Sequence, residues 1–260
     1  MGSLLKRDLA ASKRFKAKLA ARQVATLIRA TFPSPFLIER LGEHGFDAVL
    51  IDAEHGSVGR EGVEEMSRAA ALAGTAAIIR PEGSVPHLVT GYLGCGVDGF
   101  MLPVIRTPAQ AQELVDTFSF SAPLEHASRV LILMIEHIDA VRNLSALLEI
   151  EGVDAYMVAP GDLAISMGED LSRWPELSER VVSTIDQTID TIVKSGKSCG
   201  MAVTFNDVAK FLDQGVTLLY NHADHMIERG VRDYLEMIKP KIRQTGWGST
   251  SAQGMVPGPG

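Results

Sequence analysis

The chain has 260 residues, of which 46% are hydrophobic and 22% are charged, a balance typical of a soluble globular protein. A formal net charge of −7 and a pI near 5.5 argue against a nucleic-acid-binding surface. No stretch has the length and composition of a membrane span or a secretory signal, and Cys95 and Cys199 form no disulfide framework. We therefore expect a cytoplasmic protein with no membrane partner.

The first predicted element is a helix over residues 7–22, in which Leu9, Phe15 and Leu19 oppose a basic face. We expect this helix to close the bottom of the fold without joining its core. From residue 24 onward the pattern changes, and short apolar runs alternate with longer helical segments.

Eight strand-then-helix units follow in chain order. The predicted strands are 24–30, 46–53, 75–80, 99–103, 130–135, 153–159, 198–204 and 216–221. The predicted helices are 34–44, 60–73, 85–94, 108–117, 139–150, 175–195, 206–214 and 225–243. Glycines occupy the expected helix ends, at Gly45, Gly74, Gly94, Gly152, Gly196 and Gly215.

Eight such units in about 240 residues predict an α/β fold, a (β/α)₈ TIM barrel with an extra N-terminal helix. An open doubly wound sheet is the alternative, but no GxGxxG turn follows an early strand. We expect residues 1–243 to form one domain. Residues 244–260 are rich in Gly, Ser and Pro and predict a flexible tail.

Titratable residues gather where the second predicted strand ends. The stretch FDAVLIDAEHG places Asp52, Glu54 and His55 directly after a buried apolar run. The carboxyl ends of barrel strands are where ligands bind, so this stretch suggests a site. The other interpretation is a solvated turn in which Asp52 caps the next helix.

The fifth strand ends in an acid, Glu136, and Asp162 follows the sixth strand. Two carboxylates on neighbouring strands suit a hard divalent cation such as Mg²⁺ or Mn²⁺. Alternatively, Glu136 pairs with Arg80 and Asp162 caps the helix at Leu163. The backbone N–H groups of Gly161 and Asp162 open a helix and are suited to hold a substrate carboxylate.

Four motifs, GFDAVLIDAEHG, IIRP, MIE and VAPGDLA, stand in this order along the chain. Together they resemble the HpcH/HpaI class II aldolases over residues 15–243. The resemblance implies a metal-dependent lyase acting on 2-oxo acids, with Mg²⁺, Mn²⁺ or Co²⁺ as cofactor and an aldehyde as second substrate. It also implies a homo-oligomer, a hexamer or trimer, in which the last helix packs on a neighbour.

The resemblance also implies roles for individual residues. Glu136 and Asp162 match the metal ligands, and Arg80 matches the arginine that faces the ketone oxygen and the developing enolate. Gly161 and Asp162 match the segment whose backbone binds the 2-oxo acid carboxylate. His55 matches the catalytic histidine.

Asp52 matches a carboxylate of the same catalytic group, two residues before the acidic position that Glu54 occupies in this chain. The expected reaction is aldol cleavage or formation at a pyruvate-type enolate, with His55 as general base on the 4-hydroxyl of a 4-hydroxy-2-oxo acid. Two alternatives remain. One is a decarboxylase or a specialised carbon–carbon bond-forming enzyme on the same site, and the other is a non-catalytic barrel that binds a small acid.

The sequence departs from the family pattern at the partner of the histidine. The family places an aspartate at the end of the helix after the Arg80 strand, and Gly94 stands there in this chain. Glu54 and Asp98 are the two possible substitutes. The link over residues 117–129 is also short, which suggests a more open mouth or one covered by another subunit.

The eighth strand ends unusually, in Asn221, His222, Ala223, Asp224 and His225. One interpretation is an ordinary polar turn with Asp224 capping the last helix. The other is that His222 points into the mouth as a relocated acid or base. The sequence assigns no role to His225.

Overall fold

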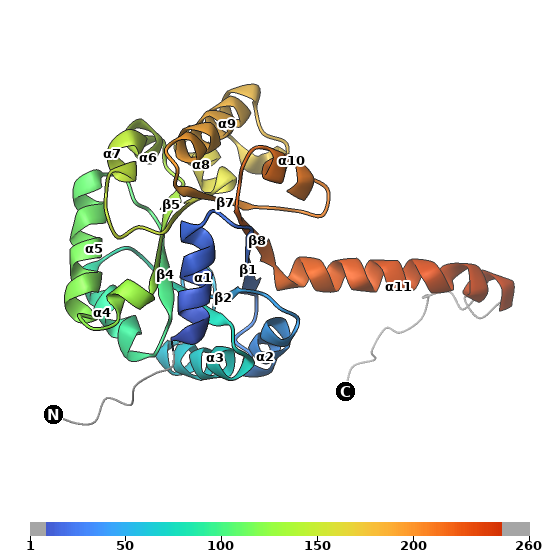
Figure 1. Cartoon of the computed structure of the whole chain (residues 1–260). Coiled ribbons are helices and arrows are strands. Elements are labelled where there is room, and N and C mark those ends of the chain that lie inside the picture. The colour runs from blue at the N-terminus through green and yellow to red at the C-terminus, as the bar shows by residue number, and fades with distance from the viewer. Residues whose placement is uncertain (1–8, 246–260) are drawn as a thin grey trace, which may run out of the picture. The chain divides into compact units, whose positions relative to one another are not determined.

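The computed structural model describes residues 9–245. Eight parallel strands close into a barrel in chain order, and each is followed by helix (Figure 1). The predicted (β/α)₈ TIM barrel is therefore confirmed. The strands are β1 Ala25–Ala30, β2 Ala48–Asp52, β3 Ala76–Arg80, β4 Gly99–Leu102, β5 Val130–Ile135, β6 Ala155–Val158, β7 Ser198–Ala202 and β8 Leu218–His222.

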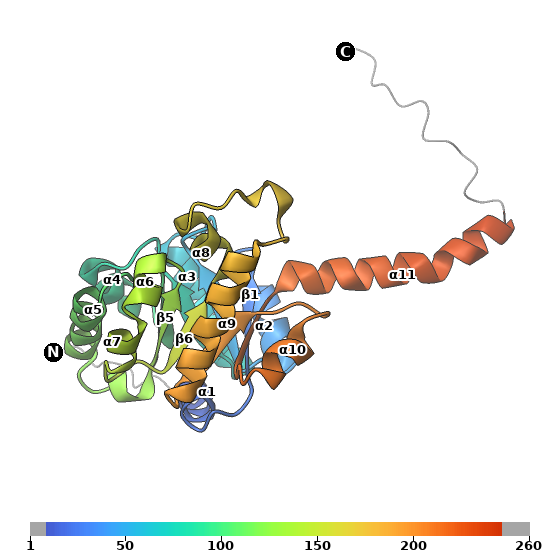
Figure 2. The same ribbon diagram turned by 90° about the horizontal axis from the view of Figure 1, so that it is seen from above.

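In the first unit the helices α2 to α10 surround the strands, as Figure 2 shows from a second direction, and the helices of the whole described chain have the following bounds. They are α1 Ala10–Ala20, α2 Pro35–Glu43, α3 Arg60–Ala73, α4 Pro86–Gly94, α5 Pro108–Ser121, α6 Ile138–Arg142, α7 Leu144–Leu148, α8 Pro160–Ser166, α9 Glu179–Lys194, α10 Val208–Asp213 and α11 Ala223–Thr245. Two short 3₁₀ helices span His126–Ser128 and Leu171–Arg173.

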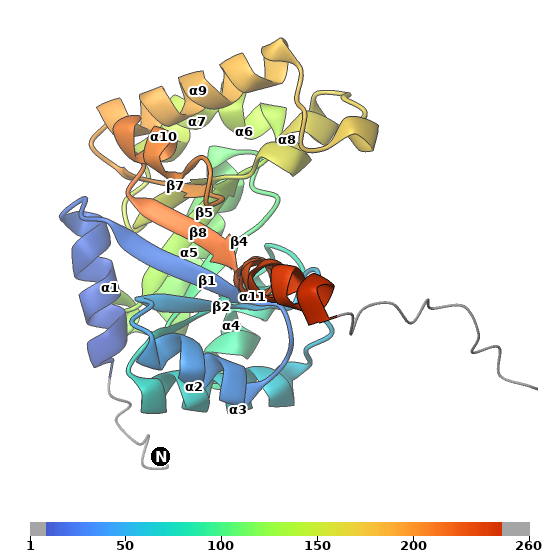
Figure 3. The same cartoon turned by 90° about the vertical axis from the view of Figure 1, so that its right-hand side faces the viewer.

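The barrel interior is filled by every second residue of its strands, because side chains alternate between the two faces of a sheet. Ala25 and Leu27 of β1 and Val130, Ile132 and Met134 of β5 belong to one buried core cluster. The strands β2, β3 and β5 are buried along their whole length, as expected for a parallel sheet covered by helices. Figure 3 shows β8, β1 and β2 side by side, and β1 pairs in parallel with both β8 and β2.

The N-terminal helix α1 closes the amino end of the barrel. Phe15 and Leu19 are 1% exposed and belong to the same core cluster as the strand residues. The Ser12 hydroxyl donates to the carbonyls of Asp98 and Ser128, where β4 and β5 begin. The helix thus closes the bottom as predicted, but the expectation that it stays outside the core is wrong.

Several predicted boundaries differ from the structure. The segment 139–150 forms two helices, α6 and α7, because Asn143 between them has non-helical backbone angles and its side-chain amide donates to the Arg106 carbonyl at 2.9 Å. The helix that the sequence analysis opens at Gly161 and Asp162 is α8, which begins at Pro160. Gly96, rather than Gly94, has the left-handed backbone (φ 79°) after α4.

The link over residues 117–129 lies at the amino end of the barrel. The helix α5 continues to Ser121, and the carbonyl of Ser128 accepts the hydroxyl of Ser12 from α1 at 2.7 Å. The Arg129 guanidinium donates to the Val97 carbonyl just before β4. A connection from a helix into a parallel strand arrives at the strand's amino end, so the expected effect of this link on the mouth is wrong.

The chain divides into two compact units, one ending at His222 and the other beginning at Ala223. The second unit begins with α11, which carries Pro240 within it. The boundary predicted at residue 243 stays a prediction, and residues from 246 onward lie outside the described range. Among the described helices, none has the length and apolar composition needed to span a bilayer.

Candidate active site

Asp52 is the centre of a charged network at the carboxyl end of the barrel. It is the last residue of β2, is 4% exposed, and is the register partner of Arg80 on β3. Arg80 binds it with both arms of its fork, Nε to Oδ1 at 2.9 Å and Nη2 to Oδ2 at 2.6 Å. Arg29 of β1 adds a second guanidinium, with Nη2 at 2.8 Å from Oδ2.

These contacts keep Asp52 ionised. Burial alone raises the pKa of its carboxyl, but the hydrogen bonds and charge of Arg80, together with the charge of Arg29, outweigh burial and hold the pKa below its usual value. The interpretation of Asp52 as a helix cap in a solvated turn is wrong, because the side chain is buried and α3 has Gly59 at its N-cap.

The turn after Asp52 carries His55. The backbone N–H groups of Glu54 and His55 donate to Asp52 Oδ1 at 3.2 and 3.3 Å. A Cβ on Gly56 would lie 2.1 Å from the Asp52 carbonyl oxygen, so only glycine fits there. The turn leaves the His55 side chain 59% exposed, with Nε2 at 3.8 Å from Oε2 of Glu54.

Glu54 is therefore the carboxylate beside the histidine. Asp98, the other predicted substitute, lies immediately before the amino end of β4 and accepts the N–H of Ala77 at 2.9 Å. It stands at the opposite end of the barrel from the turn, so that alternative is wrong. Gly94 is the last residue of α4 and offers no side chain.

Arg80 also reaches Glu54, with Nη1 at 3.0 Å from Oε2. Burial lowers the pKa of the guanidinium, but the hydrogen bond and charge of Asp52 and the charge of Glu54 outweigh it, so the pKa is raised and Arg80 stays a cation. Because these two carboxylates take its ion pairs within the described residues, the alternative that Arg80 pairs with Glu136 is wrong.

Glu136 follows the last residue of β5 and is 6% exposed. Its Oε1 accepts the backbone N–H of Val104, a residue held at φ 55°, where β-branched side chains are uncommon. Burial, together with the charges of Asp162 and Glu54, raises the pKa of Glu136 to about 7 against the opposing Val104 hydrogen bond and the charge of Arg80. A buried carboxylate with this environment is suited to a cation.

Asp162 lies in the first turn of α8, directly after β6. The N-cap of this helix is Ala159, so the interpretation of Asp162 as the cap is wrong. Its side chain is exposed, and its charge acts on both Glu136 and Glu54. The neighbouring Gly161 faces the indole of Trp174, which lies 3.6 Å from where a glycine Cβ would be.

The cup, as we name this group, contains more acid than base. Its charged members are Arg29, Asp52, Glu54, Arg80, Glu136 and Asp162. Two guanidiniums thus share this end of the barrel with four carboxylates, so carboxylates outnumber guanidiniums by two. The structure brings the predicted Asp52, Arg80, Glu136 and Asp162 together, whereas the sequence analysis missed Arg29. The alternation of Ala25, Leu27 and Arg29 along β1 was the signal that could have found it.

The end of β8 carries a further histidine. The rings of His222 and Tyr220 meet edge to face with centroids 5.0 Å apart, and Tyr220 belongs to the interior core cluster. His222 therefore lies on the interior side of β8. The helix α11 begins at once with Ala223, so Asp224 lies in its first turn instead of capping it.

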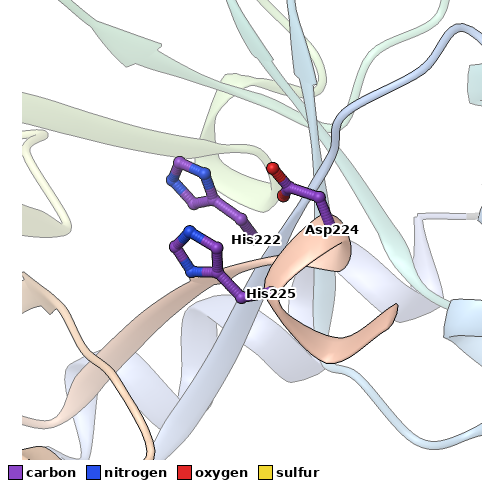
Figure 4. A group of neighbouring side chains, drawn as sticks. All are labelled: His222, Asp224 and His225. Atoms are coloured by element: carbon purple, nitrogen blue, oxygen red, sulfur yellow. The ribbon is translucent and has the colours of Figure 1, made fainter. Parts of the chain in front are cut away.

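Figure 4 draws His222 with Asp224 and His225, three residues that each offer an atom able to bind a metal, and these atoms lie within 4.8 Å of one another. Residues this close in sequence are brought together by the chain itself. The grouping alone therefore assigns no role to them.

The comparison with protein families gives a match over residues 31–227, to the model described as HpcH/HpaI aldolase/citrate lyase. It confirms the resemblance seen in the four motifs. A hydroxypyruvate/pyruvate aldolase of Cupriavidus necator is 28% identical over 241 residues, which cover 84% of this chain and 88% of that protein. A 4-hydroxy-2-oxo-heptane-1,7-dioate aldolase of Escherichia coli is 28% identical over 225 residues, which cover 77% and 85%.

Solved structures share the fold. Macrophomate synthase aligns with a TM-score of 0.71 over 92% of this chain and 91% of its own, at 18% sequence identity. At this identity the likeness concerns the barrel itself.

Proposed function

The chain belongs to the HpcH/HpaI aldolase/citrate lyase family and is a carbon–carbon lyase, and on that premise we propose that it is a divalent-metal-dependent aldolase. Its proposed substrates are 4-hydroxy-2-oxo acids, which it cleaves to, or forms from, a pyruvate-type enolate and an aldehyde. The observation that carries this proposal is the buried Glu136 carboxylate, which has a backbone donor but no ion pair among the described residues and feels the charge of Asp162.

Glu136 and Asp162 fit a divalent cation as ligands. Glu136 directly follows β5 and Asp162 lies in α8 directly after the neighbouring β6, and the charge of Asp162 raises the pKa of Glu136. The described ion pairs of Arg80 go to Asp52 and Glu54, which leaves Glu136 with a backbone donor. A bound Mg²⁺, Mn²⁺ or Co²⁺ would stabilise the negative charge of the enolate oxygen.

The chain's own residues supply orientation and proton transfer in this proposal. Arg80 is a fixed, buried cation that faces the ketone oxygen as charge develops on it. The backbone N–H groups of Gly161 and Asp162 hold the carboxylate of the 2-oxo acid. His55 removes the proton of the 4-hydroxyl, directly or through water, and Asp52 fixes both Arg80 and the turn that carries His55.

The test is pyruvate release from 4-hydroxy-2-oxo acids. The protein is assayed with added Mg²⁺, Mn²⁺ or Co²⁺ and again after EDTA treatment. We expect activity that EDTA removes and a divalent ion restores. Activity that persists unchanged in EDTA would overturn the metal role. Calorimetric titration with Mn²⁺, in the presence and absence of oxalate as an enolate mimic, gives a binding readout that needs no turnover.

Decarboxylation of a 2-oxo acid is the second candidate. It is favoured by the state of His55, which is 59% exposed and 3.8 Å from its nearest carboxylate, so its ring is weakly held. Decarboxylation needs stabilisation of the enolate but no base on a 4-hydroxyl group. A panel of oxaloacetate and 4-hydroxy-2-oxo acids decides between the two reactions by their kcat/KM values.

We further propose a cytoplasmic homo-oligomer, a hexamer or trimer, in which α11 packs on a neighbouring copy. Support comes from apolar side chains of α11 that are at least 46% exposed: Ile227, Val231, Tyr234, Leu235 and Met237. The thiols of Cys95 and Cys199 are free, as in a reducing compartment. Light scattering after size-exclusion chromatography tests the assembly, and a monomeric mass would contradict it.

A further inference from the structure

We propose that Arg29 is a positioning residue of the active site. It holds the turn that carries His55, and it shares the charge of Asp52 so that Arg80 remains available to the substrate. The assignment of a reaction to these residues rests on the proposed function. The contacts that define the role of Arg29 belong to the protein alone and are measurable without substrate.

The position of Arg29 on β1 places it in the barrel interior. Ala25 and Leu27 belong to the interior core cluster, and side chains two residues apart on a strand share a face. Arg29 therefore continues the interior row at the carboxyl end, next to Leu50 of β2 and His222 of β8 in register. Its side chain is 15% exposed.

One part of this role is electrostatic. Asp52 accepts Arg80 through two hydrogen bonds and lies 2.8 Å from Nη2 of Arg29. Arg80 also binds Glu54 at 3.0 Å. Without Arg29 the single charge of Arg80 would face two carboxylates, Asp52 and Glu54. With Arg29 present the four groups are balanced, and Arg80 keeps more of its positive field for a developing enolate.

The other part is the shape of the turn. Nη2 of Arg29 contacts Oδ2 of Asp52 and donates to the carbonyl oxygen of His55 at 3.3 Å. The N–H of His55 donates to the other carboxylate oxygen, Oδ1, at 3.3 Å. The backbone of His55 is thus linked to Asp52 twice. Its N–H donates directly to Asp52, and its carbonyl oxygen accepts Arg29, which in turn contacts Asp52. Loss of the arginine opens one of the two ties.

Arg29 makes these contacts with one nitrogen only. Its Nε is buried and has no hydrogen-bond partner among the described residues. An orphaned buried donor costs stability. A side chain that served folding alone would be expected to use more of its donors. The geometry instead fits a residue whose role depends on the contacts of Nη2 with Asp52 and the carbonyl of His55.

The test compares Arg29→Met, which removes charge and donors, with Arg29→Lys, which keeps the charge. Arg40→Met is the matched control, because Arg40 pairs with Glu43 on the exposed side of α2. Each full-length variant is assayed for kcat and KM of pyruvate release with the activating metal. The metal-free proteins are analysed by amide hydrogen exchange of the peptide containing residues 52–56.

We expect Arg29→Met to lower kcat by about tenfold to 10²-fold, as for a misplaced catalytic group, with a smaller change in KM. Exchange at residues 54 and 55 should rise about tenfold, since the turn loses one of its ties. Arg29→Lys should recover part of kcat through its charge, while the faster exchange should remain. Arg40→Met should change neither quantity.

Unchanged kcat and unchanged exchange in Arg29→Met would overturn the proposal. Full recovery of both by Arg29→Lys would overturn the part that concerns the turn and support the part that concerns charge. If Arg29→Met does not fold, Arg29→Lys and Arg29→Gln carry the same comparison. If the unmodified protein releases no pyruvate with any metal, the proposed function fails, and the exchange measurement alone decides the positioning role.

Discussion

The two ends of the barrel both bury charge, but they balance it differently. At the amino end, Lys16 of α1 meets both carboxylate oxygens of Asp154 at 2.7 Å, and Arg129 pairs with Glu125. Each of these cations has its own acid. At the carboxyl end, two guanidiniums face four carboxylates, and Glu136 accepts a backbone N–H instead of a cation.

This difference separates stability from chemistry. A one-to-one buried pair needs nothing further, and removing one partner leaves an unpaired charge that weakens the fold. A buried carboxylate without an ion pair, such as Glu136, is costly until a cation or a proton arrives, which is the condition of a binding site. The contrast agrees with the general rule that barrel enzymes act at the carboxyl end and derive stability from the other.

The largest predicted effect comes from neutralising the acid that the cup leaves without a cation. Glu136→Gln should lower kcat of the metal-dependent reaction by roughly 10³-fold, because a divalent ion loses one of two proposed ligands. The amide oxygen of glutamine can still accept the N–H of Val104, so the fold should persist. Steady-state kinetics and Mn²⁺ titration measure the effect.

The matched control is Glu125→Gln at the amino end, where the acid has the partner Arg129. It should leave kcat within twofold. Equal losses of kcat in both variants would mean that the two ends of the barrel do not differ in the way described.

How far the sequence predicts this molecule also differs between its parts. The barrel follows from eight apolar runs alternating with helices, because burial on both faces leaves a clear pattern. Glu136 and Asp162 follow from their positions after strands. The bounds of α8 and the break at Asn143 were missed, because elements of five to seven residues carry too little periodicity to detect.

The partners of each charge were the harder part. Arg29 stands inside a predicted strand, where a charged residue is usually expected on the outer face. Its interior position follows only from its spacing of two residues from Leu27, which faces the core. Strand order places Asp52 beside Arg80, but the further pairing of Arg80 with Glu54 instead of Glu136 depends on the direction of its side chain, which strand order does not give. The link 117–129 joins a helix to the next strand, so it lies at the amino end of the barrel and not at the mouth.

The second effect is on stability and concerns pH. Burial raises the pKa of Glu136 from 4.5 to about 7. Between these values the folded protein holds a proton that the unfolded chain has released, so the free energy of unfolding falls as pH rises through this window. A shift of this size corresponds to roughly 3 kcal/mol. Urea unfolding of the metal-free protein between pH 4.5 and 8 measures it.

The variant Glu136→Gln isolates this contribution. Its unfolding free energy should fall less steeply over the same pH range than that of the unmodified protein. Parallel plots of unfolding free energy against pH for the two proteins would show that the folded protein does not raise the pKa of Glu136.

The third effect tests the amino end. Lys16→Met leaves Asp154 with the backbone N–H of Leu131 and the charge of Lys197. We expect a loss of about 2 kcal/mol in unfolding free energy, less than for a fully buried pair because Lys16 is 26% exposed. Activity should stay within twofold. Lys13→Met, at an exposed position of the same helix, is the control and should change neither quantity. A large fall in kcat without a fall in stability would contradict the assignment of this end to folding.

The smallest predicted effect distinguishes two steps within the cup. His55→Ala should lower the rate of aldol cleavage by about 10²-fold, the lower end of what a general base contributes. The imidazole is exposed, and its ion-pair contact is with Glu54 at 3.8 Å, so the ring is weakly oriented. Decarboxylation of oxaloacetate should change less than threefold, because that reaction uses the cation and Arg80 but no base at a 4-hydroxyl group. His44→Ala, an exposed histidine at the end of α2, is the matched control. If both reactions fall equally in His55→Ala, the histidine supports the enolate itself, and the base for cleavage must be sought elsewhere in the cup, with the interior-facing His222 as the next residue to replace.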